Sequence, residues 1–593
     1  AKSTYYKNKF IEAKRDPRKT WKIINELLGR KKQNIDDKII NSFSNHQSTI
    51  TIANDCATSF STQAKKIIHE CNISTSNTVS FSTVHSIFLE YTNETEIYNI
   101  IRGMNVNKDP GVDGVRVMEL KRHINIFAPI LTKIINLSLQ QAIIPKMLKT
   151  SLVRPIYKKG IETDFENYRP ISILSVTDKC LEEVVVSRLN DFITKHKIIH
   201  ANQYGFQRNK STNKLLGEFT NIINESLNKN WHVLVVFIDF SKAFDTLNHK
   251  RMIEALMRAG VRGNLLKWFQ NYLQERYFRV QIKEYKSEEK AIDHGVPQGS
   301  KLGPLMFILY TNELLPIFKS AIPFAYADDT ALIVRHRNLE VATNLMQEDI
   351  IRAMRWCHDN GLVINASKTK IMHIKLSHIR SSEIVVHLEN MNCMNTTQRQ
   401  TIEQVDTYTY LGITLDSHLN WIPHIQKLRG DLKKALFAVN YLKYYANFDI
   451  QKQIYFSLVE SKLRYGILAW GSASDCHIKK ISRLQWVIRK KIERGERSKL
   501  NVLDVKQLYD MTVTLEYSDD VRFKNPINHI YNTRLRTMET YRTPVFKNKF
   551  GKRSLQYAVP SIINKLPEDI KKIRHQNLLK KTNKSFLLQQ NLN

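Results

Sequence analysis

Two adjacent carboxylates separate two apolar runs in the stretch Phe324-Ala325-Tyr326-Ala327-Asp328-Asp329-Thr330-Ala331-Leu332. The second apolar run continues to Val334, so the pattern predicts a β-hairpin with the two acids at its tip. Two exposed acids at a turn are ordinarily just solvated side chains. On their own they would indicate no function.

A third carboxylate ends another apolar segment. The run Val233-Leu234-Val235-Val236-Phe237-Ile238 is typical of a strand buried on both faces, and Asp239 follows it directly. Carboxylates at the ends of buried strands are costly unless they bind cations. Mg²⁺ takes one or two carboxylates together with substrate phosphates, and two such ions can hold both oxygens of an in-line phosphoryl transfer. Asp239, Asp328 and Asp329 are therefore candidate metal ligands and catalytic residues of a nucleotidyl transferase that uses two Mg²⁺ ions, with Mn²⁺ as the alternative.

The composition points to a polyanionic partner. The 593 residues include 90 Lys and Arg against 56 Asp and Glu, which gives a net charge of +34. No apolar run approaches the roughly 18 residues of a membrane-spanning helix, and no N-terminal signal segment is visible. We therefore expect nucleic acid rather than a membrane as the partner, and a protein that is not secreted.

The six cysteines are scattered without a C-x₂-C pair, which indicates free thiols rather than a zinc ribbon.

Further strings combine residues in an unusual order. Gly295-Val296-Pro297-Gln298-Gly299-Ser300-Lys301-Leu302-Gly303-Pro304 has the composition of a loop, but this order is much rarer than the composition. With the three acids it resembles the palm motifs of reverse transcriptases, most closely those of non-LTR (LINE-type) retrotransposons of the Jockey-like group. The resemblance is collinear from about Asn107 to Pro567. Ala327 before the acids matches the A-D-D form of non-LTR elements, whereas retroviral enzymes usually have Met there.

The resemblance implies a role for each residue of the nucleotide site. Phe244, in Asp239-Phe240-Ser241-Lys242-Ala243-Phe244-Asp245, matches the position that packs beneath the incoming sugar and excludes a 2′-hydroxyl, although a Phe is more often simply part of a core. Asp245 is expected to face away. Gln298 would contact the incoming nucleotide.

The triphosphate would be held by basic residues. Arg169, within Asn167-Tyr168-Arg169-Pro170-Ile171-Ser172, would grip phosphate oxygens in a bidentate manner, assisted by Lys158. Lys368 would protonate the leaving pyrophosphate, with Lys370 as the alternative; in a chain this basic, either could simply be surface charge.

Template and primer contacts are implied at two other strings. Gly205 and Arg208 belong to the string that resembles the template-contacting segment, although the family often has Arg where this chain has Gln207. Tyr410, Leu411 and Gly412 match the motif that supports the primer end.

The expected fold class is α+β, a right-hand polymerase with fingers, a palm built on a small antiparallel sheet and a helical thumb. The expected divisions are an N-terminal extension or linker with limited core (1–92), fingers and palm (93–416), a helical thumb (417–500) and a helical, basic C-terminal region (501–593). The apolar face from Ile425 to Val439, with lysines between, supports the thumb assignment.

These expectations give an RNA-directed DNA polymerase whose partners are an RNA template, a DNA primer or target and deoxynucleoside triphosphates. We expect it in the nucleus and cytoplasm, as a ribonucleoprotein. Jockey-like elements carry an endonuclease before the polymerase. No such domain is recognisable here, and the chain begins at Ala1 rather than Met. We therefore expect the nick in the target DNA to come from a missing part or from another protein. The alternatives are an inactive nucleic-acid-binding remnant of such an element and an enzyme like a group II intron maturase or telomerase.

Overall fold

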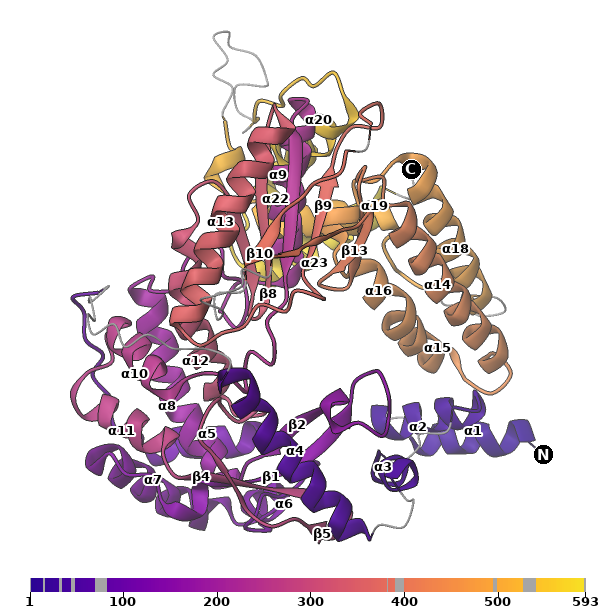
Figure 1. Cartoon of the computed structure of the whole chain (residues 1–593). Coiled ribbons are helices and arrows are strands. Elements are labelled where there is room, and N and C mark those ends of the chain that lie inside the picture. The colour runs from indigo at the N-terminus through magenta and orange to yellow at the C-terminus, as the bar shows by residue number, and fades with distance from the viewer. Residues whose placement is uncertain are drawn as a thin grey trace.

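The computed structural model describes residues 2–13, 16–30, 35–43, 48–69, 83–380, 382–389, 399–493, 499–525 and 540–590. Helices dominate, and they surround two small five-stranded sheets and two strand pairs, so the fold is α+β (Figure 1). No helix in these described ranges is both long and apolar enough to span a membrane.

The central sheet has the strand order β12-β9-β3-β8-β7. β3 lies in its middle and pairs antiparallel with β8 and β9, while β7 pairs antiparallel with β8 as the predicted hairpin. The strands are β3 (His232–Ile238), β7 (Ile322–Tyr326), β8 (Asp329–His336), β9 (Lys370–Ile374) and β12 (Glu403–Gln404).

Both faces of the central sheet are covered, as the apolar run of β3 predicted. Val233, Val235 and Phe237 contribute to one hydrophobic core, which also contains α9 (Thr212–Asn228). Leu234, Val236 and Ile238 alternate with them and contribute to a second core with α13 (Leu339–Asp359) and its neighbours. This alternation follows from the two-residue period of a strand. The helices of the second core are α5 (Glu94–Gly103), α6 (Val117–Arg122), α7 (Ile124–Gln141), α8 (Val176–Lys195), α10 (His249–Arg258), α11 (Gly263–Leu273) and α12 (Leu302–Tyr310).

The second sheet lies below the central sheet in Figure 1. Its strand order is β2-β1-β4-β5, and β6 also pairs with β4. Helix α4 packs on it, because Ile52, Ala53 and Cys56 share a core with Val153 and Val280. The elements are β1 (Thr150–Tyr157), β2 (Tyr168–Ile173), β4 (Arg276–Ile282), β5 (Tyr285–Lys286), β6 (Lys290–Ile292), α3 (Ile35–Phe43) and α4 (Thr49–His69).

A helical group follows the two remaining strand pairs. Helix α14 buries Ile425, Leu428, Leu432 and Val439, the face that the sequence predicted. The group consists of α14 (Ile422–Leu442), α15 (Phe448–Tyr455), α16 (Ser461–Arg464), α17 (Ile467–Trp470) and α18 (Asp475–Glu493). The strand pairs are β10 (His387–Glu389) with β11 (Arg399–Thr401), and β13 (Thr407–Tyr410) with β14 (Ile413–Asp416).

The first two helices reach the tip of this group. In α1 (Lys2–Glu12) the Ser3 hydroxyl donates to the Tyr444 carbonyl, and Tyr6 packs edge-on against Tyr445. Helix α2 (Pro17–Leu27) buries Ile24 in the same core. The segment before residue 93, for which the sequence predicted limited core, thus packs on two separate parts of the molecule.

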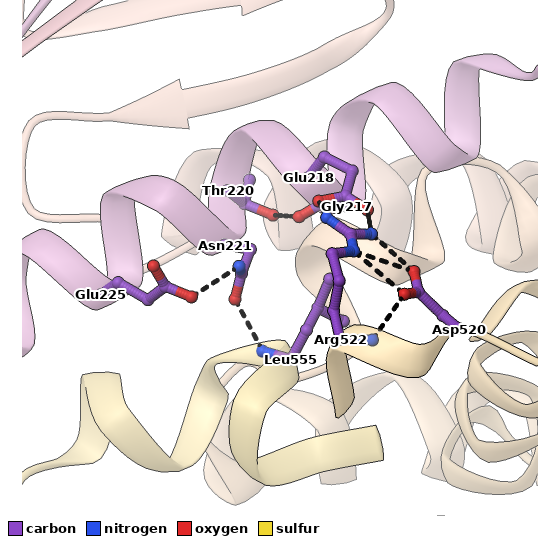
Figure 2. Close-up of polar contacts among 8 residues, drawn as sticks. All are labelled: Gly217, Glu218, Thr220, Asn221, Glu225, Asp520, Arg522 and Leu555. Carbon is purple, nitrogen blue, oxygen red and sulfur yellow. Dashed lines mark hydrogen bonds and ion pairs between the residues drawn. The ribbon is translucent and has the colours of Figure 1, made fainter. Parts of the chain in front are cut away.

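The C-terminal region packs on α9, on the side away from the central sheet. Arg522 binds Glu218 of α9 at 2.5 Å and also binds Asp520, as Figure 2 shows. The side chain of Glu218 is only 12% exposed, so the guanidinium neutralises a mostly buried carboxylate. The helices of this region are α19 (Val505–Tyr517), α20 (Lys549–Arg553), α21 (Leu555–Ile563), α22 (Glu568–Lys571) and α23 (Gln576–Gln589).

A second polar contact fixes the start of α21. The N–H of Leu555 donates to the Asn221 side chain at 2.7 Å, and Asn221 in turn donates to Glu225 (Figure 2). Asn221 thereby satisfies one of the amides that a helix N-terminus leaves without an intrahelical partner. One helix therefore joins the central sheet to the C-terminal region.

Gly217 of α9 provides a test of this packing. A Cβ at this position would lie 3.0 Å from the Cβ of Leu468 and 3.1 Å from the Tyr517 hydroxyl. We expect Gly217→Val to lower the stability of the chain by about 1–3 kcal/mol, because a well-packed contact would be overfilled. Thermal unfolding measures this. Gly430→Val on α14 is the matched control, since a Cβ there meets nothing within 4 Å; equal loss in both variants would contradict the close packing.

Candidate functional site

A cavity of about 510 Å³ lies between the central sheet and the second sheet. It collects residues from motifs that are far apart in the sequence. Among those predicted as site residues, the following line it: Lys158, Arg169, Asp239, Phe244, Gln298, Asp328 and Lys368.

Strand pairing brings the acids together. Ile238 of β3 is paired with Thr330 of β8, so Asp239 leaves β3 beside the residues that open β8. The hairpin turns at Ala327, whose φ is +58°, and Asp328 follows at the tip. Asp329 is the first residue of β8 and is paired with Tyr326; its side chain is not part of the cavity lining.

Gln203 and Gly205 hold this turn from the other side. The Gln203 side-chain oxygen accepts hydrogen bonds from the N–H groups of Gly205 (2.8 Å) and Ala327 (3.1 Å). A Cβ on Gly205 would lie 2.4 Å from the Ala327 nitrogen, so only glycine permits this close approach. Gly205, predicted as a template contact, supports the acidic turn in this structure.

Opposite charges face one another across the cavity. The Lys368 ammonium lies 3.5 Å from Asp239 Oδ2. Desolvation, and then the charge of Asp239, raises the pKa of Asp328, while Arg169 and Lys158 oppose the shift. Desolvation and the two neighbouring acids raise the pKa of Asp329 to about 6. The carboxylates therefore repel one another and are partly neutralised by the basic residues.

The donor set fits a hard divalent ion. Asp239 Oδ2 is shielded from solvent and has no hydrogen-bond partner among the described residues. Asp328 lies on the same cavity. Within the described ranges, no three His, Cys, Asp or Glu side chains form a preassembled metal cluster. One or two carboxylates with substrate phosphates are nevertheless the usual Mg²⁺ ligands, so Asp239 and Asp328 suit an ion that arrives with its substrate.

Phe244, Asp245 and Gln298 form one wall. Phe244 stacks on Phe307 with ring centroids 4.4 Å apart. Asp245, which was predicted to face away, lines the cavity instead and accepts a hydrogen bond from Gln298 Nε2 at 2.7 Å. Burial raises the pKa of Asp245 to about 6. Its position was missed because strand alternation, which places Asp239, does not extend into the turn that contains Asp245.

The loop that carries Gln298 packs closely against the backbone of two other segments, at Ser172 and at Phe244. The Ser172 N–H of β2 donates to the Gln298 carbonyl at 2.7 Å, and a Cβ on Gly299 would lie 2.4 Å from the Ser172 carbonyl. On the other side, a Cβ on Gly295 would lie 2.7 Å from the Phe244 carbonyl. The glycines allow the loop to contact neighbouring backbone of the chain itself.

The remaining predicted site residues lie away from the cavity. Arg208 forms an exposed ion pair with Asp191, and Lys370, the alternative to Lys368, binds Glu403. Residues 410–412 lie at the turn between β13 and β14. Tyr410 is buried there and its hydroxyl donates to the Phe324 carbonyl. The Leu411 carbonyl accepts a hydrogen bond from the Tyr465 hydroxyl, and Gly412 packs against the Tyr465 ring.

Residues 156–415 match the family described as reverse transcriptase (RNA-dependent DNA polymerase). They form a reverse transcriptase domain. Over 407 residues, the chain is 29% identical to the probable RNA-directed DNA polymerase from transposon BS of Drosophila melanogaster. This alignment covers 66% of this chain and 43% of that protein.

Two other relatives point the same way. The RNA-directed DNA polymerase from mobile element jockey of Drosophila melanogaster is 27% identical, over 66% of this chain and 42% of its own length. The Pol polyprotein from the type-1 retrotransposable element R1 of Bradysia coprophila is 26% identical, over 57% of this chain and 32% of its own length. The prediction of a Jockey-like non-LTR reverse transcriptase is thus confirmed. The chain spans less than half the length of these relatives.

The reverse transcriptase domain receives part of its cavity from outside the matched segment. Phe60, Gln63 and Lys65 of α4 line the cavity, and Lys242 donates a hydrogen bond to Gln63. No pattern in the sequence indicated this contribution, because the polar composition around α4 predicted an extension or linker.

Gly299 tests how the loop is held. We expect Gly299→Ala to detach the loop from β2, because the added Cβ would overlap the Ser172 carbonyl and the φ of +131° is one that alanine rarely adopts. Hydrogen exchange at the Ser172 amide should become faster. Gly114→Ala is the control: its φ is also positive, at +71°, but a Cβ there meets nothing within 4 Å. Unchanged exchange in Gly299→Ala would show that the loop is not fixed by this contact.

Proposed function

We propose that the chain is an RNA-directed DNA polymerase of a non-LTR retrotransposon, which extends a primer 3′-hydroxyl on an RNA template. The observation that carries the proposal is that Asp239 and Asp328 share one cavity with Arg169, Lys158 and Lys368. Carboxylates able to hold metal ions and cations able to hold a triphosphate are what nucleotidyl transfer requires.

The architecture suits the parts of a right-hand polymerase. The central sheet with Asp239 and Asp328 corresponds to the palm, and the second sheet with Arg169 and Lys158 corresponds to the fingers. The group α14–α18 would then be the thumb. In this arrangement the cavity between the two sheets is the nucleotide site.

The basic residues would bind and orient the triphosphate. Arg169 can hold two phosphate oxygens at once, and Lys158 adds a point charge beside it. Desolvation and the nearby Arg169 lower the pKa of Lys158, so an arriving phosphate would relieve repulsion between two cations. Mg²⁺ ions held by Asp239 and Asp328, when bound, would lower the pKa of the primer hydroxyl and neutralise charge on the reacting phosphate.

Other residues would select the nucleotide and protonate the product. Lys368, within 3.5 Å of Asp239, is suited to give its proton to the departing pyrophosphate. Phe244, backed by Phe307, is a rigid ring on the cavity wall that would exclude a 2′-hydroxyl. Gln298 would contact the base or sugar, with its amide oriented by Asp245.

Primer extension with Asp328→Ala tests the activity. With Mg²⁺, an RNA template and a DNA primer, we expect the unmodified chain to incorporate dNTPs and the variant to lose about 100-fold or more of this rate, because a metal ligand is removed. Asp293→Ala is the matched control, since Asp293 lines the same cavity but forms an ion pair with Lys65. Absence of extension by a folded, RNA-binding chain would instead favour an inactive remnant.

Asp245→Asn tests whether Asp245 orients Gln298. We expect the KM for dNTP to rise about 5-fold with little change in kcat, because a hydrogen bond to a charged acceptor becomes a neutral one. The raised pKa of about 6 means that Asp245 is ionised above that pH and loses its charge as the pH falls through it. The KM of the unmodified enzyme should therefore rise below pH 6.

In Asp245→Asn this part of the pH dependence should be absent. Steady-state kinetics from pH 5 to 8 measure both effects. A proportional loss of kcat at every pH would show that Asp245 only maintains the fold.

A further inference from the structure

Helix α18 exposes a tryptophan on a basic surface. All seven tryptophans of the chain lie in the described ranges, and Trp486, at 52% exposure, is the only one among them that is exposed. Trp268, Trp421 and Trp470, in contrast, are almost completely buried. An exposed large aromatic side chain is unfavourable in water and indicates a binding surface when its neighbours are suitable.

The neighbours on the same face are cationic. Lys479 and Arg483 precede Trp486 by seven and three residues, and Lys490 follows it by four. Residues at these intervals lie along one side of a helix. All three are exposed, and Lys479 and Arg483 have no ion-pair partner in the part of the chain that the structure describes. Lys490 lies 3.7 Å from Glu493. We call these four residues, Lys479, Arg483, Trp486 and Lys490, the α18 surface.

The opposite side of the helix fixes this orientation. Ile481, Ile488 and Ile492 are buried in the core, and Gln485 donates hydrogen bonds of 2.8 Å to the Tyr455 hydroxyl and the Leu503 carbonyl. Rotating the helix to hide Trp486 would break both bonds and expose the isoleucines. The exposure of Trp486 is therefore imposed by the packing of the helix.

The α18 surface is separate from the nucleotide cavity. None of its four residues lines that cavity, and Figure 1 shows α18 at the outer edge of the helical group. A basic surface at this place cannot serve the triphosphate. It is suited to bind a second stretch of polyanion.

We propose that the α18 surface is a binding site for single-stranded RNA. A base would stack on Trp486 while Lys479, Arg483 and Lys490 bind the flanking phosphates, over a length of about 16 Å along the helix. Assigning the strand as the part of the template outside the cavity rests on the proposed polymerase function.

The composition of the α18 surface argues against other partners. The centre of a protein–protein interface is depleted in charged residues, whereas Trp486 lies between cations. A membrane-surface helix needs a broad apolar face, and the exposed side of α18 offers one large aromatic residue. Aromatic stacking flanked by lysine and arginine is the usual composition of a single-strand site.

Binding of a fluorescein-labelled, unstructured RNA to the full chain tests the proposal, without nucleotides or Mg²⁺. We expect Trp486→Ala to weaken binding by about 5- to 100-fold and Trp486→Phe to restore most of it, because stacking is retained. Lys479→Gln/Arg483→Gln/Lys490→Gln should reduce the slope of log affinity against log salt by about 2.

The triple variant Lys572→Gln/Lys580→Gln/Lys581→Gln is the matched control, since it removes the same charge from exposed lysines elsewhere. Equal changes in both triple variants, or full affinity in Trp486→Ala, would overturn the proposal. Tighter binding of a DNA strand of the same sequence would assign the α18 surface to DNA instead. Primer extension on a short template, which tests the polymerase itself, should be unchanged in Trp486→Ala.

Discussion

The antiparallel pairing of β3 with β8 holds two carboxylates beside each other where each strand meets the cavity. In this register Ile238 is paired with Thr330. Because successive side chains of a strand point to opposite faces, a shift of one residue would turn every side chain of β3 to the opposite face of the sheet. Such a shift would exchange Val235 and Val236 between the two cores that cover the sheet. The packing of both cores therefore specifies the position of Asp239 relative to Asp328.

This arrangement is electrostatically unfavourable without partners. Desolvation and the charge of Asp239 raise the pKa values of Asp328 and Asp329, and Lys158 and Arg169 only partly compensate. The central sheet can tolerate this repulsion because it is buried on both sides and anchored by α9 and α13. The site is thus prepared for ligands that carry both signs of charge, and a metal-bound triphosphate is such a ligand.

Patterns local in sequence predicted the central sheet and its acids. The apolar run before Asp239 and the hairpin around Asp328 need only strand periodicity, and the register then follows from burying both faces. The contact between Asp245 and Gln298 could not be predicted in this way, because it joins a turn and a loop whose separation is set by the whole fold. The same holds for Arg522, whose partner Glu218 is 304 residues away in the sequence.

Contacts from outside the reverse transcriptase domain reach the cavity between the two sheets through a series of polar groups. Gln63 of α4 accepts a hydrogen bond from Lys242, the charge of Lys242 favours the ionised form of Asp245, and Asp245 accepts a hydrogen bond from Gln298. Each member acts on the next by a hydrogen bond or by its charge, so a displacement of α4 would change the environment of Gln298. Helix α4 is fixed in turn by its apolar face on the second sheet, where Ile52 and Cys56 are fully buried. The N-terminal segment is therefore part of the structure that orients the cavity wall.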